Sequence, residues 1–300
     1  MKNLTLDLNG KNITAADARA LWVKSGEVSI VDNSTGSTKG TITTTKTEGS
    51  SLVSDSSVIR VGSTGTDKAA VTIGAGVTIE APFTYGVTAF GTNDGGVELV
   101  VNGTIHAHGT EAAIAGNGNA GNKGAVTINE GAVITSDNTE AIYHPQGDTL
   151  TVKGGTITGA TGIYQKSGTL SITGGTIIGN GAKAAYTSTG DDCVPTGDAL
   201  VIDSCAYPGG APTAAVSGGT FKSVNAEAVA SYAKEESNAV SSFISGGTFS
   251  TTPDKSLLAD DMAIYPVEGK GVEVKAAPAE GKSGNFGNIN NLNVLCFFIV

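Results

Sequence analysis

One short segment recurs along the chain, and this repeat constrains the fold more than any other feature. Each copy has an apolar residue, a bend that contains glycine, and a second apolar residue five positions after the first. The best copies lie at residues 125–133, 150–157, 170–177, 216–221 and 244–249. A unit that returns along the sequence in this way is the signature of a stacked repeat architecture.

The residues around each bend indicate short strands. Leu150, Thr151 and Val152 alternate between apolar and polar, and this period of two predicts a strand with one apolar face. The Gly-Gly pair that follows permits backbone conformations that other residues rarely adopt, so it predicts a sharp bend. A third apolar patch comes after the second strand, at residues 112–114, 141–143, 162–164, 185–186 and 228–229. Each repeat is therefore predicted to have three strands.

The spacing of the copies indicates how they stack. The interval is 20 residues from Leu150 to Leu170 and 24 from Val126 to Leu150. One coil of a three-sided parallel solenoid needs about this much chain, and extra residues bulge out as loops. We therefore predict an all-β chain folded as a right-handed parallel β-helix of about ten coils, each of about 20–30 residues. A β-sandwich or a propeller is the alternative fold.

The pattern also indicates the domain organisation. Residues 1–277 are predicted to form a single β-helix domain, and residues 187–212 to form a loop-rich excursion within it. Residues 278–300 do not resemble the repeat and are predicted to be a separate tail with an apolar end. That end is about half as long as a membrane-spanning helix, and no signal peptide is visible at the start of the chain.

Charge and cysteine content limit the partners. The chain has 18 basic and 28 acidic residues, a net charge of −10. Nucleic acids and anionic membranes both require a basic surface, so we expect neither as a partner. No apolar run reaches 18 residues, so we expect no membrane span. Cys193 and Cys205 either form a disulfide across a loop or remain free thiols.

The repeats TLTVKGGTI, TLSITGGTI, VSGGTF and FISGGTFS, preceded by LTLDLNGKNIT, resemble those of right-handed parallel β-helix (pectin-lyase-like) modules. Such modules occur in bacterial cell-surface and secreted proteins and in phage fibres. The resemblance covers about residues 3–275. It implies a structural or adhesive module located outside the cell, at its surface or on a virion. The implied partner is a polysaccharide, a host cell-surface glycan or a second copy of the chain.

The same fold class also includes polysaccharide lyases and glycoside hydrolases, which makes a polysaccharide-active enzyme the alternative function. The segment GDDCV at residues 190–194 is similar to the Asp-Asp-Cys motif of polygalacturonase-type glycosidases, so Asp191 and Asp192 are the candidate catalytic pair. That family also has Gly-His-Gly and Arg-x-Lys motifs, but no histidine or arginine follows Asp192. We therefore expect no enzyme activity and interpret the pair as turn residues.

Two residue sets are candidates for metal binding. The hard oxygen ligands that Ca²⁺ prefers are available from Asp191, Asp192, Asp198 and Asp203. Soft and borderline metals would instead use His106 and His108, which are expected on one side of a strand, together with His144. The spacing of residues along the sequence does not identify a third metal ligand. We therefore interpret these histidines as exposed, neutral side chains rather than metal ligands. We expect no cofactor, with Ca²⁺ as the alternative.

Aromatic residues recur at one position of the repeat. Tyr143 and Tyr164 each follow an isoleucine in neighbouring copies, and Tyr186 and Phe90 occupy a comparable position. Rings stacked on the outer face of a solenoid would suit sugar rings. We therefore predict Tyr143, Tyr164 and Tyr186 as ligand-binding residues, with a purely stabilising aromatic stack as the alternative.

Overall fold

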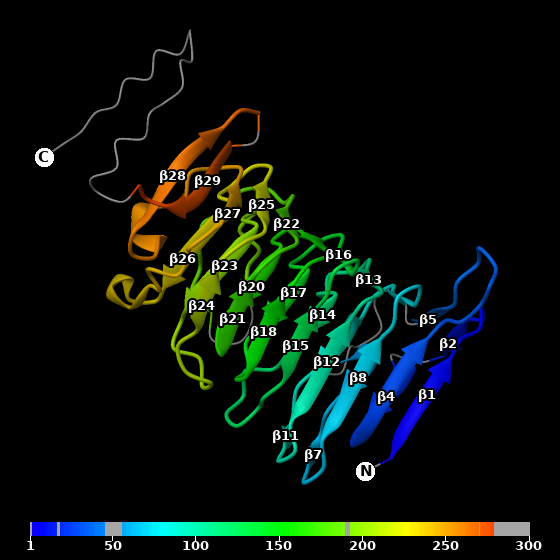
Figure 1. Ribbon diagram of the computed structural model, residues 1–300. Helices are drawn as coiled ribbons and strands as arrows, with labels where there is room; N and C mark the ends of the chain where they lie inside the picture. The colour runs from blue at the N-terminus through cyan, green and yellow to red at the C-terminus, as the bar shows by residue number, and fades with distance from the viewer. Residues whose placement is uncertain (1, 17–18, 46–55, 190–192, 270, 279–300) are drawn as a thin grey trace, which may run out of the picture.

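The computed structural model describes residues 2–16, 19–45, 56–189, 193–269 and 271–278. Three long sheets of stacked strands run along the molecule, and most of their strands are parallel (Figure 1). Successive strands of the chain belong to different sheets, so each coil adds one strand to every sheet. The predicted parallel β-helix is confirmed, and the alternative of a sandwich or propeller is wrong.

Each of the three sheets has its own set of strands. Sheet A contains β1 (Asn3–Asp7), β4 (Gly26–Val31), β8 (Ala69–Ile73), β12 (Val97–Val101), β15 (Ala125–Ile128), β18 (Thr149–Val152), β21 (Thr169–Ile172) and β24 (Thr213–Val216). Sheet B contains β2 (Ile13–Ala15), β5 (Thr41–Thr44), β9 (Thr78–Ala81), β13 (Thr104–Ala107), β16 (Val133–Ser136), β19 (Thr156–Gly159), β22 (Thr176–Gly179), β25 (Thr220–Ser223), β27 (Gly247–Phe249), β29 (Gly271–Ala276) and β28 (Met262–Val267). Sheet C contains β3 (Leu21–Val23), β6 (Ser57–Val61), β10 (Tyr85–Ala89), β14 (Ile114–Ala115), β17 (Ile142–His144), β20 (Ile163–Gln165), β23 (Leu200–Ser204) and β26 (Val229–Ala233).

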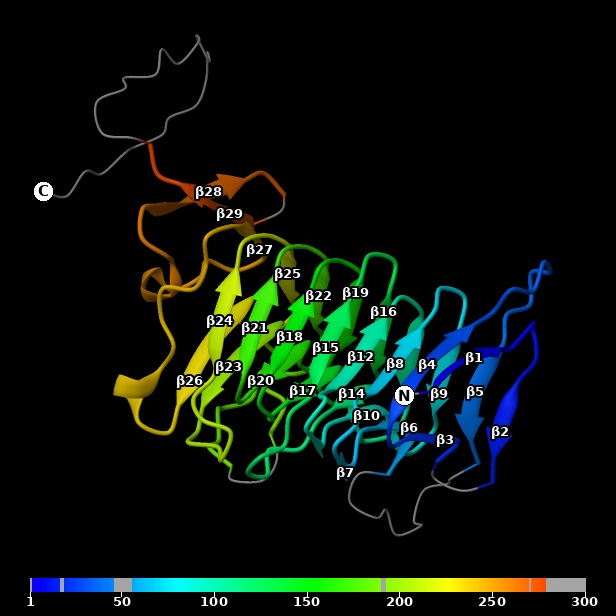
Figure 2. The same cartoon turned by 60° about the horizontal axis from the view of Figure 1, so that its bottom comes forward.

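The described residues form eight complete coils and part of a ninth, fewer than the ten predicted. A short ladder of β7 (Thr64–Gly65) and β11 (Thr92–Asn93) lies outside the three sheets, and η1 (Glu236–Asn238) and η2 (Lys255–Leu257) are single 3₁₀ turns. Strands β28 and β29 form an antiparallel hairpin beyond the last coil, at the end of the solenoid away from the N-terminus (Figure 2). Among the residues that the structure describes, no helix is long and apolar enough to cross a membrane.

The core is a set of columns of identical or similar side chains. From the second coil onward, the inward residue of each sheet B strand lies in register with the next, and all are buried: Ile42, Ile79, Ile105, Ile134, Ile157, Ile177, Phe221 and Phe249. The last two rings stack with centroids 4.9 Å apart. Burying each such side chain stabilises the fold by roughly 1.5–3 kcal/mol, so the columns are the main source of stability.

The two glycines of each bend serve different purposes. Gly175 has a φ of +90°, a conformation that residues with a Cβ rarely adopt. Gly174, just before it, is needed because a Cβ there would lie 2.6 Å from the carbonyl oxygen of Lys153 in the preceding coil. The bend therefore requires one glycine for its backbone conformation and one for the close approach of the stacked coil.

One predicted strand position is wrong. Residues 185–186 were expected to form the third strand of their coil, but β23 occupies that place instead. Leu200 and Ile202 of β23 both bury their side chains in the main core. The 185–186 pair offers only one large apolar side chain, so the chain leaves the solenoid after β22 and rejoins it at β23. Among the described residues, the excursion comprises 182–189 and 193–199 before β23 and 205–212 after it.

Asp32 fastens the bends of the first two coils. Its carboxylate accepts hydrogen bonds from the Ser34 hydroxyl and from the backbone N–H groups of Gly10, Ser34 and Gly40. The Ser34 hydroxyl is the largest cause that holds the pKa of Asp32 well below its usual range, and the backbone donors add to it. The ionised carboxylate is thus part of the folded structure.

The direction in which the side chains point can be tested on β19. Ile157 faces the core, and we expect Ile157→Ala to lower the free energy of unfolding by about 2–5 kcal/mol. Thr158 faces outward, so Thr158→Ala should change that free energy by only about 0.5 kcal/mol. Equilibrium urea unfolding followed by circular dichroism measures both. Equal losses would contradict the assigned register.

The role of Asp32 predicts a pH dependence. Because the pKa of Asp32 is lower in the folded protein than in the unfolded chain, its contribution is complete above about pH 4 and lost as the pH falls below that value. Asp32→Asn should therefore lower the unfolding free energy at pH 7 and flatten the decline of that free energy as the pH falls below about 4. The exposed Asp260→Asn variant is the control, and identical pH profiles for the two variants would refute the assignment.

Candidate functional site

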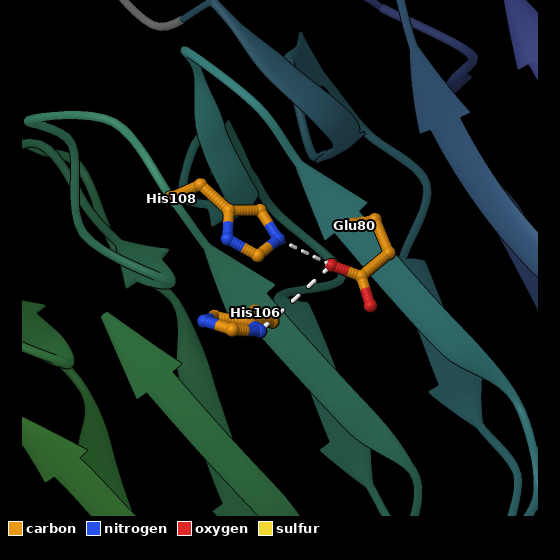
Figure 3. A group of neighbouring side chains, drawn as sticks. All are labelled: Glu80, His106 and His108. Atoms are coloured by element: carbon orange, nitrogen blue, oxygen red, sulfur yellow. Dashed lines mark hydrogen bonds and ion pairs between the residues drawn. The ribbon is translucent and has the colours of Figure 1, made fainter. Parts of the chain in front are cut away.

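Two histidines and two acidic residues gather on the outer face of sheet B. Strand β9 turns Glu80 outward, because its neighbours Ile79 and Ala81 are buried. Strand β13 does the same for His106, which is the in-register partner of Glu80 in the next coil. His108 follows β13, and Asp137 follows β16. The group, which we call the histidine cluster, thus comes from three adjacent coils; Figure 3 shows three of its members.

The two imidazole rings lie between the two carboxylates. Glu80 Oε2 is 2.7 Å from His108 Nε2 and 3.9 Å from His106 Nδ1 (Figure 3). On the other side, Asp137 lies 2.7 Å from His106 Nε2 and 3.0 Å from His108 Nδ1. The ring centroids are 3.8 Å apart. Each ring therefore turns one nitrogen toward Glu80 and the other toward Asp137.

The carboxylates change the proton affinity of the cluster. Partial burial by itself lowers the pKa of His108, but hydrogen bonds with Glu80 and Asp137 outweigh it and raise that pKa above its usual value. The bond from His106 is the largest cause that lowers the pKa of Asp137. The four side chains are between 29% and 43% exposed, so solvent and ions reach them.

The sequence predicted only part of this cluster. His106 and His108 lie side by side as expected, but His144 is wrong as their third partner. It lies on sheet C, where burial lowers its pKa to about 4 and Gln165 is within hydrogen-bonding distance. Glu80 and Asp137 were missed. The segments VTIEA and GTIHA carry Glu80 and His106 at the same repeat position, so alignment of the repeats would have found the first of them.

A second group of polar residues is buried outside sheet C. Tyr143 and Tyr164 are in-register partners, as predicted from their repeat position. They are covered rather than exposed, with 6% and 0% of their surface accessible. Tyr143 shares a 2.9 Å hydrogen bond with the hydroxyl of Tyr207, a residue of the excursion. Their predicted place on the open surface is therefore wrong, because the excursion folds over them.

Tyr186 does not continue this column. The in-register neighbour of Tyr164 is Val201, since β23 takes the strand position. Tyr186 instead stacks on Tyr232, with ring centroids 4.6 Å apart, and donates a 2.7 Å hydrogen bond to Asp203. Tyr164 also donates to Asp203, at 3.3 Å. The contacts of Tyr186 attach the excursion to the solenoid, which agrees with the alternative that these tyrosines stabilise the fold. Glycan binding by these tyrosines stays a prediction.

The four aspartates proposed for Ca²⁺ or catalysis are only partly placed. Asp191 and Asp192 lie outside the described residues. Asp198 and Asp203 are both buried, and Asp198 accepts hydrogen bonds from the Thr196 and Tyr232 hydroxyls. Ca²⁺ binding and catalysis by this set stay predictions. Cys193 and Cys205 are both buried and are not joined in a disulfide.

A buried lysine completes this second group. Lys166 follows β20, and its ammonium group lies 3.9 Å from Asp203, with both side chains fully buried. Its Nζ also donates to the carbonyl oxygen of Thr189 at 3.0 Å and lies 4.5 Å from the centre of the Tyr207 ring. Burial raises the pKa of Asp203, although Lys166 acts in the opposite direction. The lysine joins both parts of the excursion to sheet C.

No protein-family model, curated protein or solved structure matches the chain. The class that the fold defines is a parallel β-solenoid with a polar, partly exposed histidine cluster on one face and a buried polar group beneath a long excursion.

The buried pair predicts a large cost for removing one partner. Lys166→Met and Asp203→Leu should each lower the free energy of unfolding by about 3–5 kcal/mol, because each leaves a buried polar group without its partner. The double variant should lose less unfolding free energy than the sum of the losses of the two single variants. Urea unfolding measures the cycle.

Lys183→Met is the matched control for that cycle. Lys183 forms an exposed ion pair with Glu227, and such pairs contribute about 0–1 kcal/mol. Strict additivity of the Lys166 and Asp203 substitutions would show that the two buried side chains act independently.

Proposed function

We propose that the protein is a non-catalytic structural and adhesive β-helix module, located outside the cell, at its surface or on a virion, that binds polysaccharide. The resemblance of its repeats to pectin-lyase-like modules of surface proteins and phage fibres supports this function. The observation that carries the proposal is a row of threonines along the outer face of sheet B.

This threonine row extends through most of the solenoid. Its members lie in register from coil to coil, with Val133 in one position among them: Thr41, Thr78, Thr104, Thr156, Thr176, Thr220 and Thr248. All of them are partly or fully exposed. A core does not require the same polar residue in so many coils, since only the inward side chains pack there. The repetition therefore favours a surface role.

The row has the properties of a binding surface for an extended chain. Neighbouring hydroxyls are spaced by the distance between strands, about 4.8 Å. Each hydroxyl both donates and accepts hydrogen bonds, which suits the hydroxyls of a polysaccharide. β-Branched threonines on a stacked sheet have few conformations to lose, so binding costs little side-chain entropy. The net charge of −10 favours a neutral polysaccharide over an acidic one.

A binding screen with substitutions in the row tests this function. The chain should be retained on at least one neutral polysaccharide without cleaving it. The triple variant Thr156→Val, Thr176→Val, Thr220→Val should weaken binding by about tenfold or more, because each lost hydrogen bond contributes about 0.5–1.5 kcal/mol. Valine keeps the shape and the β-propensity of threonine. Affinity electrophoresis measures retention, and reducing-end release measures cleavage.

The control variant carries the same changes on a different face. Outward threonines of sheet A are replaced in Thr127→Val, Thr149→Val, Thr151→Val, which should bind as the unchanged chain does. Equal weakening by both triple variants would contradict a role of the row. Cleavage would contradict a non-catalytic module, and its loss in Asp191→Asn, Asp192→Asn would assign the activity to that pair.

A further inference from the structure

We propose that Glu80, His106 and His108 bind one divalent transition-metal ion, Zn²⁺ by their chemistry, on the outer face of sheet B. Asp137 orients both imidazole rings from behind. The site is complete without a glycan, so this inference does not rest on the function proposed above.

The three donor atoms already converge on a common point. Each of Glu80, His106 and His108 offers one ligand atom, and the three atoms lie within 4.8 Å of one another. In a tetrahedral zinc site with bonds of about 2.0–2.1 Å, the ligand atoms are about 3.3 Å apart. Glu80 Oε2 lies 2.7 Å from His108 Nε2, which is shorter than that ideal separation, and 3.9 Å from His106 Nδ1, which is longer (Figure 3). Small side-chain rotations are therefore enough to form the site.

The donor set selects the class of metal. Two imidazoles and one carboxylate suit Zn²⁺ and its neighbours in the first transition row, whereas Ca²⁺ and Mg²⁺ prefer an all-oxygen set. Three protein ligands leave a fourth position to solvent or to an oxygen of a bound partner. The side chains of Glu80 and His108 are 33% and 42% exposed, so the ion has a path from solvent.

Asp137 distinguishes this cluster from a chance surface ion pair. Its two carboxylate oxygens contact the two ring nitrogens that face away from Glu80, His106 Nε2 and His108 Nδ1. When those nitrogens carry the protons, Nδ1 of His106 and Nε2 of His108 are the free bases that a metal requires. A carboxylate behind a metal-binding histidine fixes the tautomer and the ring orientation in this way.

The solenoid holds the ligands in place before a metal arrives. His106 and His108 are two residues apart at the end of β13, so their side chains point to the same side. Glu80 is aligned with His106 by the parallel ladder, and Ile79 and Ile105 anchor the two strands in the core. Binding therefore orders little backbone, which favours affinity.

Isothermal titration of the full chain with ZnCl₂, after removal of metals with a chelator, tests the proposal. One Zn²⁺ per chain should bind, and Glu80→Gln, His106→Asn and His108→Asn should each weaken binding by at least about tenfold. Asp137→Asn should weaken it by about 10–100-fold, as expected of a residue that orients the ligands. Ca²⁺ should not compete at equal concentration. Circular dichroism confirms that each variant is folded.

Two controls keep the result specific. Glu98→Gln changes an exposed carboxylate on sheet A in the same coil as His106, and it should bind Zn²⁺ as the unchanged chain does. Co²⁺ should give the visible absorption of a tetrahedral ion without thiolate charge transfer, which separates this site from one at the cysteines. Absence of binding, or binding that survives His106→Asn and His108→Asn, would overturn the proposal.

Discussion

The stacking of inward side chains from coil to coil is the interaction on which the rest of the structure depends. A single coil has too little apolar surface to remain folded, but each one adds an isoleucine or phenylalanine to columns such as that of Ile134, Ile157 and Ile177. Because the packing is repetitive, the register of one coil determines the register of the next. The glycine bends serve this packing by letting coils approach closely at the corners.

That inner register also determines what the outer surface presents. Side chains alternate along a strand, so every buried isoleucine of sheet B places its two neighbours outside. The threonine row and the histidine cluster are both consequences of this alternation. Glu80 and His106 meet because Ile79 and Ile105 are stacked, although the two polar residues are 26 positions apart in the chain. The surface chemistry thus follows from packing in the core.

The excursion over sheet C follows a different principle. The sheet C strands β17, β20 and β23 are buried on both faces, unlike β18 of sheet A and β19 of sheet B, whose outer residues remain partly exposed. Polar residues below the excursion therefore need partners, and Asp203 finds Tyr164, Tyr186 and Lys166. Such contacts are specific to one arrangement, because each buried polar group is costly without its partner.

The repeat pattern was sufficient to predict the parallel β-helix, its three strands per coil, the glycine bends and the register of Tyr143 with Tyr164. All of these follow from local periodicity, which a repeat displays openly. Three features became evident only in the folded chain: the tyrosines are covered, β23 rather than residues 185–186 completes a coil, and Glu80 and Asp137 join the histidines. These outcomes depend on where a long loop folds back and on which coils become neighbours. Neither is encoded in the spacing of nearby residues, because both arise from contacts between segments distant in the chain.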